Sequence, residues 1–204
     1  MTLVNNKKKT FLYSFLFSLA FFLLAHGYRF SNNLFAGDSL TNLYQIDSSW
    51  QIAIGRIFEP VYLMFRGTLG SPWITSLLAI IYYSLAIYFL ADLFKFNNLH
   101  QILLVSGIFT CNITITATNA AYVHCLDMYA LALLFAILGV WLICRQKTYC
   151  IIGGTVSLTL SLGLYQAYIA VAISLVMFII LFALAGLTTI GAYIYVKRRK
   201  EADI

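Results

Sequence analysis

Carboxylate and guanidinium side chains gather in one hydrophilic stretch of an otherwise apolar chain. Residues 34–60 carry three of the seven acidic residues, among them Asp38 and Asp47; Arg56 lies in the same stretch and Arg66 follows it. A positioned carboxylate can accept the proton of a hydroxyl, and a guanidinium fork is suited to phosphate. The stretch therefore has the groups needed to act on a phosphate ester. The plainer alternative is that Asp38 caps a helix and the other charges keep an interfacial segment soluble.

Four more polar side chains lie near the ends of later apolar segments. His124 and Asp127 are three residues apart, so a helix would place them on one face. Tyr165 and Gln166 belong to the turn YQAY, and aromatic faces combined with a few polar groups are typical of ligand sites. All four are candidate substrate contacts. The alternatives are a helix cap with an interfacial histidine, and the ordinary enrichment of tyrosine at membrane interfaces.

A metal site has little support in the sequence. Asp127, His124 and a loop carboxylate could be assembled around a divalent cation, but no metal-ligand motif indicates one. The four cysteines show no ligand spacing either. We therefore predict neither a metal nor a cofactor.

The elements that position these residues must be membrane helices. The chain has 204 residues, of which 62% are hydrophobic and 10% are charged, whereas soluble domains are about a quarter charged. We predict an all-α polytopic bundle, a single transmembrane domain over residues 1–204. The net charge of +6 does not indicate nucleic-acid binding, because the basic residues sit in short clusters beside apolar segments.

Long apolar runs predict about six transmembrane helices. The fifth is short and the sixth is long for a bilayer of about 30 Å. The predicted spans cover residues 11–28, 73–94, 99–118, 126–143, 149–165 and 168–196.

The basic residues set the orientation of these spans. With six crossings, ten of the thirteen Lys and Arg residues fall on one side, which the positive-inside rule makes cytoplasmic. Both termini are then cytoplasmic, and residues 29–72 form the first external loop. Within that loop, apolar residues recur every three or four positions from Leu43 to Val61, which predicts an amphipathic helix lying at the interface. We expect Gly55 to weaken this helix and Pro60 to end or kink it.

Several short motifs together resemble one known family. They are a basic start, a first span, an external Gly37-Asp38 turn, a W-x(5)-R pattern that ends in Gly55-Arg56, and the YQAY turn. This combination is similar to the glucosyltransferase II family of bacterial O-antigen modification, the serotype-converting enzymes often carried by prophages. The similarity extends over roughly residues 11–185.

The resemblance implies a GT-C-like membrane glycosyltransferase in the bacterial inner membrane. Such an enzyme takes a hexose, here glucose, from a polyprenyl-phosphate donor and places it on O-antigen or lipopolysaccharide at the periplasmic face. An acid of the first external loop is essential in that architecture, and the matching residue is Asp38, with Asp47 second. The carboxylate would accept the proton of the acceptor hydroxyl, while Arg56 stabilises the leaving phosphate.

The sequence leaves two alternatives to an active glycosyltransferase. Family members are expected to be considerably longer than this chain, which favours a truncated or remnant copy, or a short relative that needs a membrane-protein partner. The second alternative is a non-enzymatic membrane protein, such as a lipid-linked sugar transporter or an assembly partner. A transporter would place its polar site near the bilayer midplane, whereas here the polar residues gather on one face.

Overall fold

The computed structural model describes residues 7–32, 34, 38–41, 49–68, 71–96 and 98–202. All the secondary-structure elements assigned within these ranges are helices. At Asp38, Thr41, 191–192 and 194–202 the description covers the backbone only. The predicted all-α bundle is confirmed. In chain order the helices are α1 (Lys7–Ser31), α2 (Asp38–Thr41), α3 (Ser49–Ala53), α4 (Glu59–Arg66), α5 (Pro72–Leu93), α6 (Leu99–Cys111), α7 (Ile113–Ala121), η1 (Val123–Cys125), α8 (Leu126–Ile143), α9 (Thr148–Leu164), η2 (Gln166–Tyr168) and α10 (Ile169–Ala202).

Five helical segments in the described ranges are long and apolar enough to cross a membrane. They cover Lys7–Ser31, Pro72–Leu93, Leu99–Ala121, Val123–Ile143 and Gln166–Ile190. The fifth predicted span, residues 149–165, corresponds to α9, which is apolar but has only 17 residues. At 1.5 Å per residue it is about 25 Å long, somewhat shorter than a typical hydrocarbon core.

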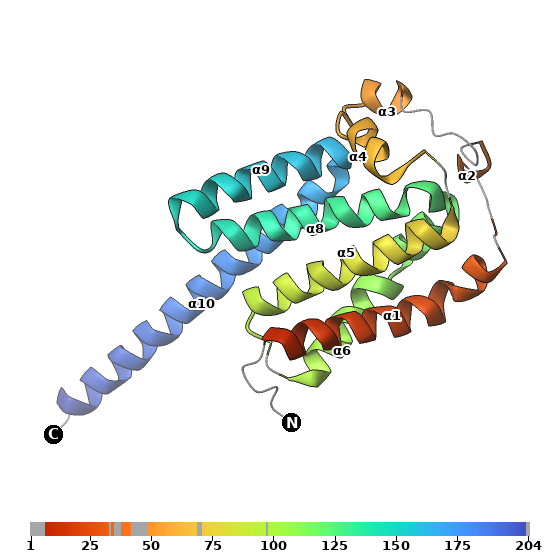
Figure 1. Ribbon diagram of the computed structural model, residues 1–204. Helices are drawn as coiled ribbons and strands as arrows, with labels where there is room; N and C mark the ends of the chain where they lie inside the picture. The colour runs from red at the N-terminus through yellow and green to blue at the C-terminus, as the bar shows by residue number, and fades with distance from the viewer. Residues whose placement is uncertain are drawn as a thin grey trace.

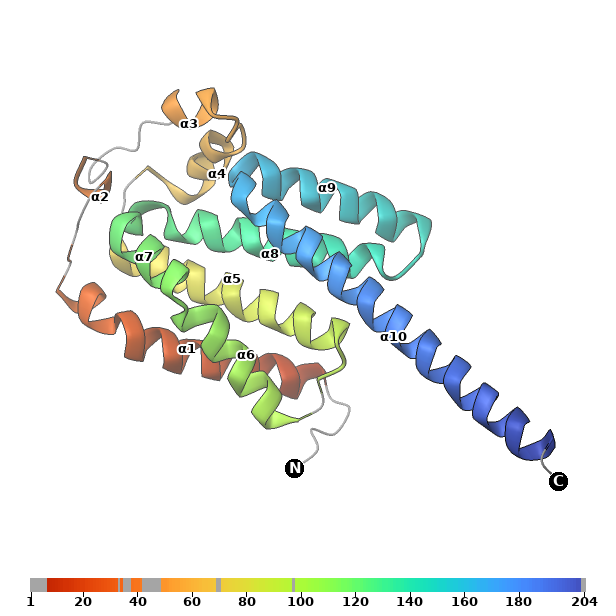
Figure 2. The ribbon, with the colours of Figure 1, turned by 180° about the vertical axis from the view of Figure 1, so that it is seen from behind.

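The helices form two packed layers. Figures 1 and 2 show α9, α8, α5 and α1 side by side in one layer, with α10, α7 and α6 across one face of it. In the first layer α1 and α5 run antiparallel, as do α8 and α9, whereas α5 and α8 run parallel because α6 and α7 lie between them in the chain. The last helix, α10, packs against α8 near its start and then runs past the other helices (Figure 1).

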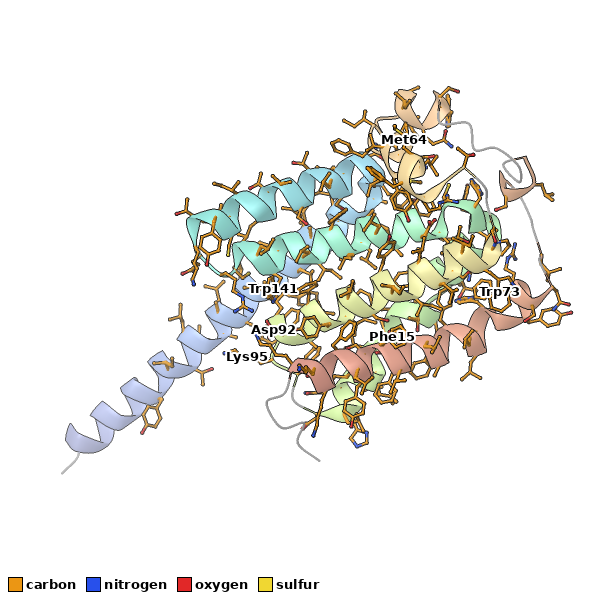
Figure 3. The ribbon with its side chains drawn as sticks, viewed as in Figure 1. Phe15, Met64, Trp73, Asp92, Lys95 and Trp141 are labelled. Carbon is orange, nitrogen blue, oxygen red and sulfur yellow. The ribbon has the colours of Figure 1, made fainter. Side chains whose placement is uncertain are left out.

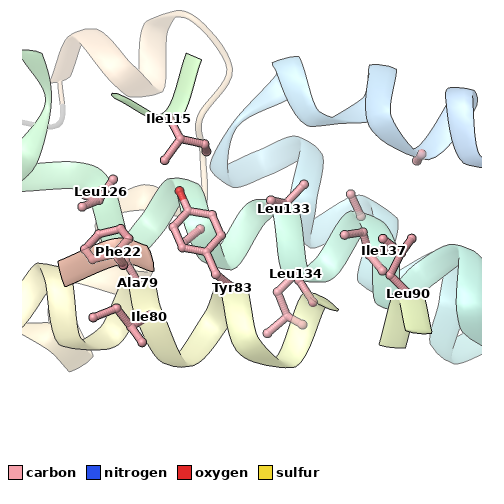
Figure 4. Packing of buried hydrophobic residues seen from close by; sticks show 14 of the residues in the cluster. Phe22, Ala79, Ile80, Tyr83, Leu90, Ile115, Leu126, Leu133, Leu134 and Ile137 are labelled. Carbon is pink, nitrogen blue, oxygen red and sulfur yellow. The ribbon is translucent and has the colours of Figure 1, made fainter. Parts of the chain in front are cut away.

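The core lies between the two layers. Tyr83 of α5 and Phe22 of α1 are its largest fully buried side chains, and Ile137 of α8 lies in the same cluster (Figure 4). Between α8 and α9 the backbones come very close, since a Cβ added at Gly154 would lie 2.8 Å from the carbonyl oxygen of Gly139. Close approach at small residues is how membrane helices gain packing energy.

The segment between α2 and α5 differs from the predicted amphipathic helix. Within the described residues, helix is interrupted between Ala53 and Glu59, where Gly55 has a φ of +93°. Pro60 lies in the first turn of α4 instead of ending a helix, because its fixed φ and missing N–H suit that turn. The first part of the predicted helix, residues 42–48, lies outside the described residues.

The basic end of the bundle has its own polar anchor. Asp92 on α5 pairs with Arg145 after α8, with 2.5 Å between Oδ2 and Nη2, and it also accepts a hydrogen bond of 2.8 Å from the indole N–H of Trp141. Figure 3 shows Asp92, Lys95 and Trp141 together at this end, opposite Met64 and Trp73.

Candidate active site at the end that carries α2 to α4

The polar residues singled out in the sequence meet at the end of the bundle opposite this anchor. There α2, α3 and α4 gather over the start of α8 and the end of α9 (Figure 1). The inner face of α4 carries Glu59, Leu63 and Arg66, which recur every three or four residues. A helix turns its side chains to one face at this spacing, so α4 presents these three residues to the bundle.

A buried ion pair joins α4 to α8. The Nε of Arg66 lies 3.1 Å from Oδ2 of Asp127, and the two side chains are only 3% and 0% exposed. The hydroxyl of Tyr62 donates to the same carboxylate oxygen at 2.8 Å. Arg66 also donates to the carbonyl oxygen of His124 at 2.8 Å. The structure thus brings Arg66 of the external loop together with Asp127 and His124, and it makes Arg66 the link between α4 and η1.

The imidazole of His124 holds α2. The hydroxyl of Ser39 lies 3.0 Å from Nδ1 of His124 and donates to the carbonyl oxygen of Ala121 at 3.0 Å. Because the hydroxyl has one proton, which goes to Ala121, Nδ1 is the donor toward Ser39. Asp38 is the residue before Ser39, so its backbone is held beside η1, whereas its side chain and the whole of Asp47 lie outside the described residues.

Arg56 lies between two aromatic rings. Its Nη1 donates to the hydroxyl of Tyr129 at 3.1 Å, and its guanidinium carbon lies 4.7 Å from the ring centroid of Tyr165 and 5.5 Å from that of Tyr129. These distances are within the range of cation–π attraction. Arg56 is half-buried, and its Nε has no hydrogen-bond partner within the described residues. Part of the donor capacity of the guanidinium is therefore unused.

The YQAY turn binds the connection between α3 and α4. Gln166 donates through Nε2 to the carbonyl oxygen of Ile54 at 2.9 Å, and the N–H of Phe58 donates to the carbonyl oxygen of Gly163 at 3.0 Å. Gln166 therefore fixes the loop that carries Arg56, while Tyr165 supplies a ring beneath it.

A further carboxylate, Glu59, was not singled out in the sequence. It opens α4, is 0% exposed, and neither of its oxygens has a hydrogen-bond partner within the described residues. Burial raises the pKa of Glu59 to about 7, although the positive charges of Arg56 and Arg66 oppose the shift. An acidic residue beside a proline in the first turn of a helix is ordinary. Only its position between two arginines could have marked it.

In the parts of the chain that the structure describes, no three His, Cys, Asp or Glu side chains come together as a metal site would require.

The fold and this site define the chain as a polytopic α-helical membrane protein with a buried, charged site at one end of its bundle. The glucosyl transferase GtrII family matches residues 27–190. Because this match covers most of the chain, including α2 to α4 and both polar turns, the chain belongs to that family of glucosyl transferases. Comparisons with curated proteins and with solved structures gave no significant match.

Proposed function

We propose that the chain transfers a glucosyl group from a polyprenyl-phosphate donor to O-antigen or lipopolysaccharide, at the periplasmic face of the bacterial inner membrane. The observation that supports this most is Arg56, a half-buried guanidinium with unused donor capacity at one end of an apolar bundle. A lipid-linked phosphate can bind there while its chain stays in the bilayer. Family membership supplies the reaction class.

The orientation follows from charge. Lys7 to Lys9 begin α1, Lys95 follows α5, and Arg145 and Lys147 follow α8, all at the end opposite the site. Such clusters favour the cytoplasmic side. Both termini are then cytoplasmic and α2 to α4 lie outside.

Apolar side chains beside the site suit the donor's chain. On α4, Met64 and Phe65 are 83% and 88% exposed, and Val61 is also exposed. Trp50 of α3 and Ile57 of the connection are exposed as well. Side chains of this kind are stable only against lipid or another apolar surface. The polyprenyl chain would lie along them, with its phosphate at Arg56.

The remaining residues have separate roles in this scheme. Asp38 accepts the proton of the acceptor hydroxyl, and Asp47 is the second choice for that role. Arg56 stabilises the negative charge that develops on the leaving phosphate. His124, Asp127 and Gln166 contribute by holding α2, Arg66 and the α3–α4 connection, and Tyr165 offers a ring to the sugar.

The test uses cells that make O-antigen and express the full chain. We expect mass analysis of the O-antigen to show an added hexose, and Arg56→Ala to reduce this addition by about 10²- to 10³-fold, as loss of an oxyanion-type contact does. Lys147→Ala is the matched control, because Lys147 also lies over a tyrosine ring, 5.8 Å from the centroid of Tyr149, at the opposite end. It should leave the addition unchanged.

Two outcomes would contradict the proposal. Unmodified O-antigen from well-inserted wild-type protein would favour a transporter, an assembly partner or a remnant. Equal activity of Arg56→Ala and Lys147→Ala would remove the phosphate role from Arg56.

A further inference from the structure

Glu59 is the buried acid that the proposed function does not use. Its carboxyl group is fully buried at the first turn of α4, and within the described residues it forms no hydrogen bond and no ion pair. An unpaired buried carboxylate costs several kcal/mol (order of magnitude) and gains no compensating contact. A purely structural role gives no reason to keep such a group, because glutamine or an apolar residue would be more stable there.

The surroundings of Glu59 are rich in charge. Arg56, from the connection before α4, and Arg66, from α4 itself, both act on its charge, and Cys125 of η1 also lies within range. One step further out, Asp127 of α8 binds Arg66 and Tyr62, and Tyr129 of α8 binds Arg56. Arg66 is already neutralised by Asp127, so Arg56 is the cation that a new anion would engage first. An anion at Arg56 would then lie beside Glu59, and like charges at that separation disfavour each other.

We propose, resting on the proposed function, that Glu59 binds a proton when the donor phosphate binds and then acts as the general acid that protonates the leaving phosphate. The donor is a phosphodiester with one negative charge, which makes an ionised Glu59 unfavourable and keeps its carboxyl neutral. This assigns opposite proton transfers to two acids, Glu59 and Asp38.

The transfer step balances as follows. The oxygen of the acceptor hydroxyl forms a bond to the anomeric carbon, and its proton moves to the carboxylate of Asp38. The bond from the anomeric carbon to the phosphate oxygen breaks, and its electron pair stays on that oxygen. The proton of Glu59 moves to the phosphate, so the polyprenyl phosphate leaves as a monoanion. Glu59 is then ionised beside the product, and this repulsion favours product release.

The pKa of Glu59 suits a general acid that works near neutral pH. Burial raises the pKa of Glu59 to about 7, so the free protein holds a mixture of both forms near neutrality. A catalytic acid is most effective when its pKa lies near the working pH. At pH 8 the carboxyl is mostly ionised before the donor binds, and donor binding should therefore take up close to one proton.

Proton uptake can be measured without turnover. The probe is farnesyl glucosyl phosphate, a short phosphodiester whose own charge is constant between pH 6 and 9, titrated calorimetrically into the full chain in detergent. Measurements at pH 8 in two buffers of different ionisation enthalpy give the number of protons taken up. We expect uptake of close to one proton for the wild type and none for Glu59→Gln. Asp92→Asn, at the other end of the bundle, should behave as the wild type.

Kinetics provide the second test, with a readout that a structural role would not change. In the wild type kcat/KM for the donor should fall as pH rises above about 7, roughly tenfold per pH unit, because this ratio reports the pKa of the free protein. Glu59→Gln should lower kcat about 10²- to 10³-fold and lose this alkaline dependence, while KM for the donor stays within about twofold.

The outcomes separate the two proposals. If Arg56→Ala abolishes binding but Glu59→Gln takes up as many protons as the wild type, the role of Glu59 is wrong and the proposed function stands. If the wild type does not bind the probe, or Arg56→Ala binds it equally well, the proposed function fails and the role of Glu59 fails with it.

Discussion

At the scale of single residues, charge burial separates the two ends of the bundle. The pair Arg66–Asp127 is almost fully buried, whereas the pair Arg145–Asp92 is partly exposed, with 44% and 24% of the two side chains accessible. Removing one partner of a buried pair leaves an uncompensated charge, but exposed pairs contribute little. The same chemical change should therefore have different effects at the two ends.

We expect Asp127→Asn to lower the stability by about 3 kcal/mol, because Arg66 loses its counter-charge. Asp92→Asn should cost about 1 kcal/mol or less. Thermal unfolding of both variants in the same detergent measures the difference. Equal losses would show that burial does not govern the cost of breaking these pairs.

Glu59 predicts a pH dependence of stability. Its pKa rises from 4.5 to about 7 on folding, so the folded state binds the proton more tightly. Between these values the unfolded state binds fewer protons, and stability must fall as pH rises. We expect a loss of about 3 kcal/mol between pH 5 and pH 8. Denaturation curves should show this slope for the wild type, and a flat profile for Glu59→Gln would confirm its source.

Sequence reasoning found part of this site. It selected Arg66 as a guanidinium suited to phosphate, and His124 and Asp127 as polar groups at the end of an apolar segment; the structure brings these three together. It did not show that Gln166 binds a backbone carbonyl 112 positions earlier in the chain, because such a contact depends on how separate hairpins pack. Glu59 was missed for the same reason.

At the scale of elements, the connection between α3 and α4 is shaped by its two special residues. Both Gly55 and Pro60 were expected to disturb a helix, and both lie where helix is absent or begins. Periodicity alone could not distinguish one long helix from two short ones. The break between the two short helices is fixed by the contact of Phe58 with Gly163, which lies at the end of α9, far away in the sequence.

Gly163 should therefore not tolerate a side chain. A Cβ at this position would lie 2.1 Å from Cδ2 of Phe58, so Gly163→Ala should displace the α3–α4 connection and lower activity at least tenfold (order of magnitude). Gly186→Ala is the matched control, because nothing lies within 4 Å of a Cβ at that site on α10. O-antigen modification measures both. Normal activity of Gly163→Ala would contradict the importance of this contact.

At the scale of the whole molecule, long apolar runs were sufficient to predict the bundle and most of its helices. The order in which helices pack was not predictable, because in lipid the hydrophobic effect does not select partners. The α8–α9 contact depends on Gly139 and Gly154, whose spacing in the sequence carries no obvious signal. The break between α6 and α7 depends on Asn112, which accepts a hydrogen bond of 3.0 Å from the N–H of Ile115.

The orientation can be checked in intact cells. After replacement of the four native cysteines, we expect a membrane-impermeant maleimide to label Thr68→Cys but not Tyr149→Cys, since both positions are exposed at opposite ends of the bundle. Lysed cells should label both. The reverse pattern would invert the topology and place the site in the cytoplasm.

The α3–α4 connection and the end of α4 are fastened to two different hairpins. Gln166 and Gly163 hold the connection to the hairpin of α9 and α10, while Arg66 at the end of α4 binds the carbonyl of His124 in the turn before α8. Any tilt of α9 and α10 relative to α8 should therefore change the distance between the guanidinium groups of Arg56 and Arg66. Since α9 is short for a bilayer and α10 is long, lipids of different acyl length should impose different tilts. Membrane thickness is then expected to set the reaction rate, which reconstitution in bilayers of graded thickness would reveal.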